Sequence, residues 1–170
     1  MNDKNLADIK LFAMDVDGTL TDGKIYMGND GEMFKAFDVK DGLGIKLLKA
    51  QGITPVIITG RTSAIVKNRA KEIGITEVRQ GVKNKAEELV ILMNEYHVTK
   101  EQVAYIGDDM NDLSAIKTAG ITFAPADCAD FLVDYVDIIL SKPAGKAPVR
   151  EAIDMILREL HISFENFTDL

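Results

Sequence analysis

The chain alternates short, mainly apolar runs with longer amphipathic stretches. Apolar runs of this length, bounded by polar or glycine residues, are typical of strands buried on both faces of a sheet. They occur at residues 11–14, 54–59, 103–106, 121–123 and 138–140. The intervening stretches carry apolar residues at helical spacing. The alternation predicts an α/β protein: a three-layer α/β/α, Rossmann-like fold around a parallel sheet.

One segment departs from this alternation. Residues 25–27 and 33–37 flank the tetrad Gly-Asn-Asp-Gly at 28–31, which is typical of a hairpin turn. A β-hairpin flap is therefore expected soon after the first strand. The helix that follows is expected to have Asp41 as its N-cap and to end at Ala50. Further helices are expected over residues 63–73, 83–96, 113–119 and 149–160.

Composition limits the possible partners and the cellular compartment. The 170 residues are 46% hydrophobic, which is enough for one domain, 1–170, with a substantial core. A net charge of −7 argues against a nucleic-acid surface. The single cysteine, Cys128, excludes an intrachain disulfide framework and suits a reducing compartment. No apolar run approaches membrane length, so a cytoplasmic protein without a membrane partner is expected.

Two carboxylates follow the first strand. Asp15 and Asp17 are two residues apart, so in an extended chain their side chains point the same way, and Gly18 allows the chain to turn after them. Open α/β sheets bind ligands at this end of their strands. Two like charges so close require a cation or a retained proton. A solvated acidic turn is the alternative, whereas a calcium loop fits poorly because Leu20 stands where an EF-hand needs glycine.

Later strand ends add complementary groups. Thr59 and Gly60 end the second strand, where a hydroxyl and a backbone amide can bind phosphate oxygens. Asp108 follows another strand and adds a third carboxylate, a set of hard oxygen ligands that suits Mg²⁺. Lys85, near the start of a helix, could neutralise a phosphoryl group, although a single helical lysine is more often simply solvated.

Together these groups resemble the four motifs of the haloacid dehalogenase superfamily. The motifs are Asp15-x-Asp17-Gly-Thr, Thr59-Gly60, Lys85 and Gly107-Asp108-Asp109-x-Asn111-Asp112, in this order. Further segments resemble the 3-deoxy-D-manno-octulosonate 8-phosphate phosphatases within that superfamily. These segments are residues 22–28, 35–37, 41–45, 58–61 and 81–85. The resemblance covers about residues 10–151, most of the chain.

The resemblance implies a mechanism and a metal site. Asp15 would attack phosphorus and form an aspartyl-phosphate, and Asp17 would protonate the leaving oxygen and then deprotonate water. Asp15, the backbone carbonyl of Asp17, and Asp108 would hold Mg²⁺. The expected outer shell of the metal consists of Asp109, Asn111 and Asp112.

The resemblance also implies a substrate, 3-deoxy-D-manno-octulosonate 8-phosphate, hydrolysed to the free sugar acid during lipopolysaccharide precursor synthesis. The expected phosphate-binding residues are Thr59, Gly60 and Lys85. Arg61 and Arg69 match family positions near the sugar acid, and Lys40 stands where relatives often carry arginine. These three residues are therefore the expected contacts of the sugar acid.

A cap domain has no room in this chain. Only the hairpin follows the first motif, and the 25 residues between Thr59 and Lys85 are used by a helix and a strand. The resemblance implies a homotetramer in which neighbouring subunits close each open site. The apolar residues of the hairpin, Ile25, Met27, Met33 and Phe34, are candidates for that interface.

Two alternatives remain open. A nine-carbon ulosonate 9-phosphate could be the substrate, but phosphatases of that kind tend to carry glutamate after Thr-Gly, where this chain has Arg61. A non-catalytic oligomerisation module is the other alternative, because similar modules are attached to sugar-nucleotide synthetases. The intact motifs, and a chain of 170 residues without a fused partner, favour the enzyme.

Overall fold

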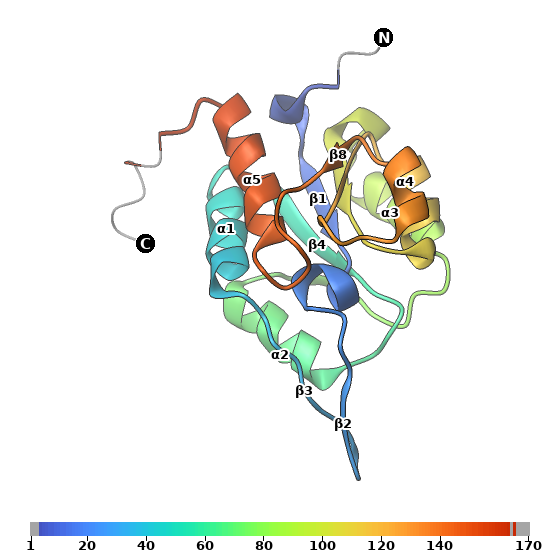
Figure 1. The fold of residues 1–170 in the computed structure, drawn as a ribbon. Helices are drawn as coiled ribbons and strands as arrows, with labels where there is room; N and C mark the ends of the chain where they lie inside the picture. The colour runs from blue at the N-terminus through green and yellow to red at the C-terminus, as the bar shows by residue number, and fades with distance from the viewer. Residues whose placement is uncertain (1–3, 164, 166–170) are drawn as a thin grey trace.

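The sheet at the centre of the computed structural model, which describes residues 4–163 and 165, is six-stranded and parallel. Its strand order is β5-β4-β1-β6-β7-β8. The strands are β1 (Leu11–Met14), β4 (Thr54–Ile58), β5 (Glu77–Arg79), β6 (Val103–Ile106), β7 (Ile121–Ala124) and β8 (Ile138–Ile139). A separate antiparallel pair, β2 (Tyr26–Gly28) and β3 (Gly31–Phe34), projects from the body as the expected hairpin flap (Figure 1).

Helices cover both faces of this sheet (Figure 1). One face carries α1 (Val39–Ala50), α2 (Ala64–Ile73) and α5 (Pro148–Glu159), and the other carries α3 (Lys85–Glu95) and α4 (Leu113–Thr118). Short 3₁₀ helices lie at Leu6–Asp8, Lys100–Gln102, Met110–Asp112 and Asp130–Asp134. None of the described helices combines the length and the apolar character that a membrane crossing requires.

The alternation of side chains along the buried strands builds two cores. In β1, Phe12 and Met14 pack in one hydrophobic cluster with residues of α1, α2 and α5. Leu11 and Ala13 pack in the other cluster, with residues of α3 and α4. All four side chains are fully buried, as a strand with helices on both faces requires. The three-layer α/β/α fold predicted from the sequence is thereby confirmed.

The strand order brings three loops to one edge of the sheet. β1 lies between β4 and β6, with Met14 in register with Ile57 and with Ile106. The segments that follow these strands therefore leave the sheet side by side. From β1 the chain continues to β4 on one side of β1 and later to β6 on the other side. The strand order therefore reverses at β1, and open α/β sheets bind ligands at such a position.

The start of α1 differs from the prediction. Its N-cap is Asp38, which accepts a hydrogen bond from the amide of Lys40, whereas Asp41 lies in the first turn and is buried. Asp41 Oδ1 accepts a hydrogen bond from the backbone amide of Arg150, at 2.7 Å. Helix α5 has no side-chain cap at Ala147, the residue before it. Asp41 therefore caps a distant helix, a role that the local pattern around it could not reveal.

This position makes the stability of the fold depend on pH. Burial raises the pKa of Asp41 from 3.8 to about 7, although the Arg150 amide acts in the opposite direction. Since the folded state holds this proton more tightly than the unfolded state, the contribution of Asp41 to the free energy of unfolding is lost as pH rises from about 4 to about 7. Asp41→Asn keeps the hydrogen-bond acceptor without the charge. We expect the free energy of unfolding of this variant, relative to that of the parent, to be higher at pH 8 than at pH 5.

Urea unfolding at the two pH values measures this difference. Asp41→Ala serves as the comparison, because it also removes the acceptor of the α5 amide and should be less stable than Asp41→Asn by about 0.5–2 kcal/mol at both pH values. The prediction is contradicted if the difference in unfolding free energy between Asp41→Asn and the parent is the same at both pH values.

Candidate active site

The turn after β1 places the first two carboxylates. Asp15 is buried, and its backbone amide donates to the carbonyl oxygen of Ile106, at 3.0 Å. The segment Val16–Leu20 forms a wide turn in which Asp17 and Gly18 are not helical, and Gly18 has a φ of +88°. A Cβ atom at Gly18 would lie 2.0 Å from Asp108 Oδ2. The turn therefore needs glycine both for its backbone conformation and for the close approach of Asp108.

Lys85 lies between two buried carboxylates. Its Nζ donates to Asp15 Oδ1 and to Asp112 Oδ1, each at 2.6 Å. Burial lowers the pKa of Lys85, but the charges of Asp15 and Asp112 outweigh that effect and raise it above its ordinary value. The two carboxylates therefore favour the ammonium form of the lysine, which connects the start of α3 to the end of β1.

Asp112 organises the loop after β6. Its Oδ1 also accepts a hydrogen bond from the hydroxyl of Tyr105, at 2.6 Å, and its Oδ2 accepts from the amides of Asp108 and Asp109, at 2.9 and 3.3 Å. A Cβ atom at Gly107 would lie 2.4 Å from Asp112 Cγ, so this side chain packs directly on the backbone. Asp112 thus fixes the position of Asp108.

Three of the carboxylates lie close enough together to attract a cation. Oxygen atoms of Asp15, Asp108 and Asp112 all lie within 4.8 Å of one another, and Asp108 Oδ1 is buried with no hydrogen-bond partner among the described residues. Burial and mutual repulsion raise the pKa of Asp15 to about 7 and that of Asp108 to about 8. Lys85 neutralises one of the three charges, so a divalent cation fits the remainder. Oxygen ligands are those that Mg²⁺ prefers.

The other predicted metal residues occupy different positions. Asp17 Oδ1 is paired with Lys35, and its Oδ2 lies 3.8 Å from Arg61 Nε. A metal contact through the backbone carbonyl of Asp17 remains a prediction. Asp109 accepts a hydrogen bond from the amide of Met110, at 2.7 Å, and Asn111 is exposed on the same short helix. Their outer-shell roles remain predictions.

The predicted phosphate-binding residues meet at the same edge. Thr59 follows β4 directly, is buried, and donates its amide to the carbonyl of Arg79, at 2.9 Å. Gly60 is exposed beside it. Because β4 neighbours β1, these two residues lie on the side of Asp15 next to that strand, while Asp108 follows the strand on its other side.

Two of the predicted substrate residues lie apart from this centre. Arg69 on α2 pairs with Glu72 at 3.0 Å, and its guanidinium lies 5.8 Å from the centre of the Phe37 ring. Lys40 lines a groove that also contains Lys146. Within the described residues, no hydrogen bond or ion pair connects Arg69 or Lys40 to the carboxylates of the site. Contact of these two residues with a sugar acid remains a prediction, whereas Arg61 is already beside Asp17.

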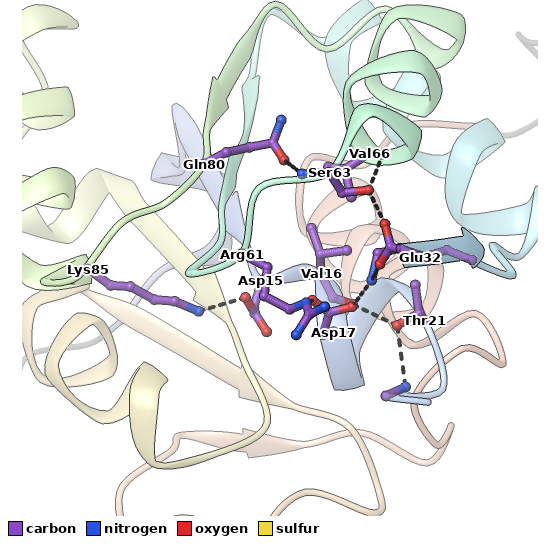
Figure 2. A network of polar contacts seen from close by, with 12 residues as sticks. Asp15, Val16, Asp17, Thr21, Glu32, Arg61, Ser63, Val66, Gln80 and Lys85 are labelled. Carbon is purple, nitrogen blue, oxygen red and sulfur yellow. Dashed lines mark hydrogen bonds and ion pairs between the residues drawn. The ribbon is translucent and has the colours of Figure 1, made fainter. Parts of the chain in front are cut away.

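A buried lysine from the hairpin side of the site was not predicted. Lys35 follows β3 and donates a hydrogen bond to Asp17 Oδ1, and its Nζ lies 2.9 Å from Glu32 Oε1. Glu32 Oε2 accepts a hydrogen bond from the hydroxyl of Ser63, so the network reaches the N-cap of α2 (Figure 2). Burial lowers the pKa of Lys35, but hydrogen bonds to Asp17 and Glu32 outweigh it and raise the pKa. The sequence indicated residues 35–37 only as a family segment.

Comparison with known proteins identifies the family. A family model for haloacid dehalogenase-like hydrolases matches residues 32–120. The 3-deoxy-D-manno-octulosonate 8-phosphate phosphatase of Escherichia coli K12 is 40% identical over 150 residues, 88% of this chain and 80% of that protein. The chain belongs to the haloacid dehalogenase-like hydrolase family. As the resemblance predicted, it is a phosphoric monoester hydrolase, with phosphatases as its relatives.

Solved structures extend this similarity to the whole fold. The phosphatase from Moraxella catarrhalis, in complex with magnesium ion, phosphate ion and KDO, is 42% identical with a TM-score of 0.91, covering 95% of this chain and 92% of that one. The cobalt-bound form of the Haemophilus influenzae phosphatase is 40% identical with a TM-score of 0.91, covering 97% and 95%. Family membership therefore does not depend on the motifs alone.

Tyr105 is a second residue whose role was not predicted. The sequence gives it only as a buried strand residue, yet its hydroxyl donates to Asp112 inside the core. We expect Tyr105→Phe to lower the free energy of unfolding by about 1 kcal/mol, because Asp112 loses one donor but retains Lys85. Phosphatase activity should fall less than tenfold, since the contact between Lys85 and Asp15 persists.

Urea unfolding measures the effect of this substitution. Tyr135→Phe is the matched control, because Tyr135 is 48% exposed and no change of comparable size is expected there. Equal unfolding free energies for Tyr105→Phe and the parent would show that the buried hydroxyl does not stabilise the loop.

Proposed function

We propose that this protein hydrolyses 3-deoxy-D-manno-octulosonate 8-phosphate to the free sugar acid and phosphate, with Mg²⁺ as cofactor. The observation that carries the proposal is the buried Asp15, held by Lys85 at 2.6 Å beside Asp108. Relatives that carry this activity in their names match 88% of the chain, and a similar phosphatase binds magnesium, phosphate and KDO. The reaction would supply a lipopolysaccharide precursor in the cytoplasm.

The side chains of the first turn would perform the chemistry in two steps. Asp15 attacks phosphorus to form an aspartyl-phosphate, while Asp17 gives its proton to the departing sugar oxygen. Asp17 then takes a proton from water as the water attacks phosphorus and the Asp15–phosphorus bond breaks. The ammonium of Lys85 lowers the pKa of Asp15, against the effect of burial, and so favours the ionised form that attacks.

The remaining groups would position the phosphoryl group. Asp15, the Asp17 carbonyl and Asp108 would hold Mg²⁺, which when bound neutralises negative charge at the phosphoryl group. The residues proposed to bind phosphoryl oxygens are Thr59, Gly60 and Lys85. Asp109, Asn111 and Asp112 would form the outer shell. Phosphoryl transfer depends mainly on such positioning and charge neutralisation, and the meeting of three strand ends supports this assignment.

The sugar acid would bind on the open side of the site. In the described chain only the hairpin lies between the first motif and α1, and only α2 and β5 lie between Thr59 and α3, which supports a single domain without a cap. Arg61, half exposed and 3.8 Å from Asp17 Oδ2, provides a guanidinium for the carboxylate of the substrate.

Neighbouring subunits would complete the site. The hairpin exposes apolar side chains to solvent, among them Met27 at 61%, Met33 at 63% and Phe34 at 48%. Such a group of exposed apolar residues usually marks an interface. We propose that these hairpins pack together in a homotetramer, the assembly implied by the family.

Phosphate release from a panel of sugar acid phosphates tests the reaction. We expect the eight-carbon 8-phosphate to be hydrolysed with a higher kcat/KM than a nine-carbon ulosonate 9-phosphate. Asp15→Asn should abolish turnover while the circular dichroism spectrum is unchanged, because the attacking oxygen is lost. Activity of Asp15→Asn within tenfold of the parent would exclude Asp15 as the nucleophile, and higher activity on the nine-carbon substrate would replace the proposed one.

The same assay tests the cofactor. EDTA should abolish activity and Mg²⁺ should restore it, whereas Ca²⁺ should not, because calcium takes more ligands in a looser geometry. Full activity with Ca²⁺ alone would contradict the proposed metal site.

Sedimentation combined with activity at matched concentrations tests the assembly. Phe34→Asp should dissociate the oligomer and lower turnover of the sugar phosphate at least tenfold, because a charge would be buried in the hairpin contact. Lys71→Asp, on the exposed surface of α2, is the control for a new surface carboxylate. A fully active monomer would exclude a shared site.

A further inference from the structure

The burial pattern of the hairpin segment is the reverse of the usual one. Between residues 22 and 38 only Lys35 is buried, while Met27, Met33 and Phe34 are exposed. Lysine is almost never fully buried unless it is paired, because removing a charge from water is costly. The side chain of Lys35 is 1% exposed, so its partners must compensate for that cost.

Those partners are two carboxylates, Asp17 in the turn after β1 and Glu32 on β3. Lys35 donates a hydrogen bond to Asp17 Oδ1, and its Nζ lies 2.9 Å from Glu32 Oε1. Glu32 is fixed in turn by the hydroxyl of Ser63, whose backbone amide donates to Gln80 Oε1 at 2.7 Å (Figure 2). The ammonium is therefore held by Glu32 as well as by Asp17, and Glu32 is anchored to the N-cap of α2, which in turn contacts the segment after β5.

This contact makes the two oxygens of Asp17 unequal. Oδ1 is held by Lys35, whereas Oδ2 faces Arg61, whose side chain is 52% exposed and whose Nε lies 3.8 Å away. Rotation of the carboxylate would break the contact with Lys35. Among the described residues Oδ2 accepts no hydrogen bond, so it is the oxygen left for the leaving oxygen of a substrate.

We propose that Lys35 is the positioning residue for Asp17: it holds Oδ1 so that Oδ2 exchanges the proton. In the first step the Oδ2 proton passes to the sugar oxygen as its bond to phosphorus breaks. In the second step Oδ2 takes a proton from the attacking water. The inference rests on the proposed function, in which Asp17 is the acid and then the base. Glu32 and Ser63 hold Lys35 in place.

A comparison of leaving groups tests the proposal. A sugar alkoxide needs a proton to leave, whereas p-nitrophenolate needs little help, and kcat/KM reports the steps up to its departure. We expect Lys35→Met to lower kcat/KM for the sugar phosphate at least tenfold more than for p-nitrophenyl phosphate. Lys24→Met is the matched control in the segment leading into the hairpin, because Lys24 is 71% exposed and pairs with Asp22; its kcat/KM should be unchanged.

Combination with Asp17→Asn separates positioning from a general structural effect. In the Asp17→Asn background, Lys35→Met should cause no further selective loss, because the group it positions is already disabled. If Lys35→Met does not fold, Lys35→Gln, which keeps a donor without the charge, is measured on the same two substrates and should show the same selectivity to a smaller extent. Equal losses on both substrates, or a further selective loss in the double variant, overturn the proposal.

The outcome for Asp17→Asn alone distinguishes failure of this proposal from failure of the proposed function. A selective loss in Asp17→Asn without one in Lys35→Met overturns only the role of Lys35. Equal losses of kcat/KM on both substrates in Asp17→Asn would show that Asp17 is not the acid. In that case the proposed positioning role of Lys35 is overturned as well.

Discussion

Through its contacts with Asp15 and Asp112, Lys85 holds together three parts of the site that are far apart in the sequence. It joins the end of β1, the first turn of α3 and the loop after β6 within 2.6 Å contacts. Removal of one partner from a buried ion pair typically costs about 3–5 kcal/mol, because the other charge is left uncompensated. Asp112 extends the constraint to Asp108 through the backbone amide.

The same contact leaves the site short of positive charge. One ammonium lies beside a cluster of three carboxylates, and in the described part of the chain Asp108 keeps an oxygen without a hydrogen-bond partner. Burial, together with mutual repulsion, raises the pKa of Asp15 and of Asp108, and a bound cation would stabilise their ionised forms. Folding therefore builds a cation site by bringing together carboxylates that separate loops supply.

Much of this arrangement was predictable because it follows from strand order. Asp15, Thr59 and Asp108 each follow an apolar run, and parallel strands in one sheet end at the same edge. The sequence pattern does not predict which distant residue a side chain will contact in the folded protein. Asp41 resembles a local helix cap, yet its carboxylate accepts a hydrogen bond from the backbone amide of Arg150, 109 residues away. A lysine in an exposed hairpin is expected in solvent, and nothing local to Lys35 indicates Asp17.

The turn after β1 thus places two carboxylates in opposite electrical surroundings. Asp15 lies among other carboxylates with a single ammonium, while Asp17 lies between Lys35 and the guanidinium of Arg61. Paired titratable groups in contrasting environments are a frequent basis for assigning nucleophile and proton carrier in enzymes. Here the contrast arises from the backbone, because Asp17 and Gly18 leave the helical conformation within the turn. One carboxylate is directed to α3 and the β6 loop, and the other to the hairpin, so the division of roles depends on the hairpin as much as on the sheet.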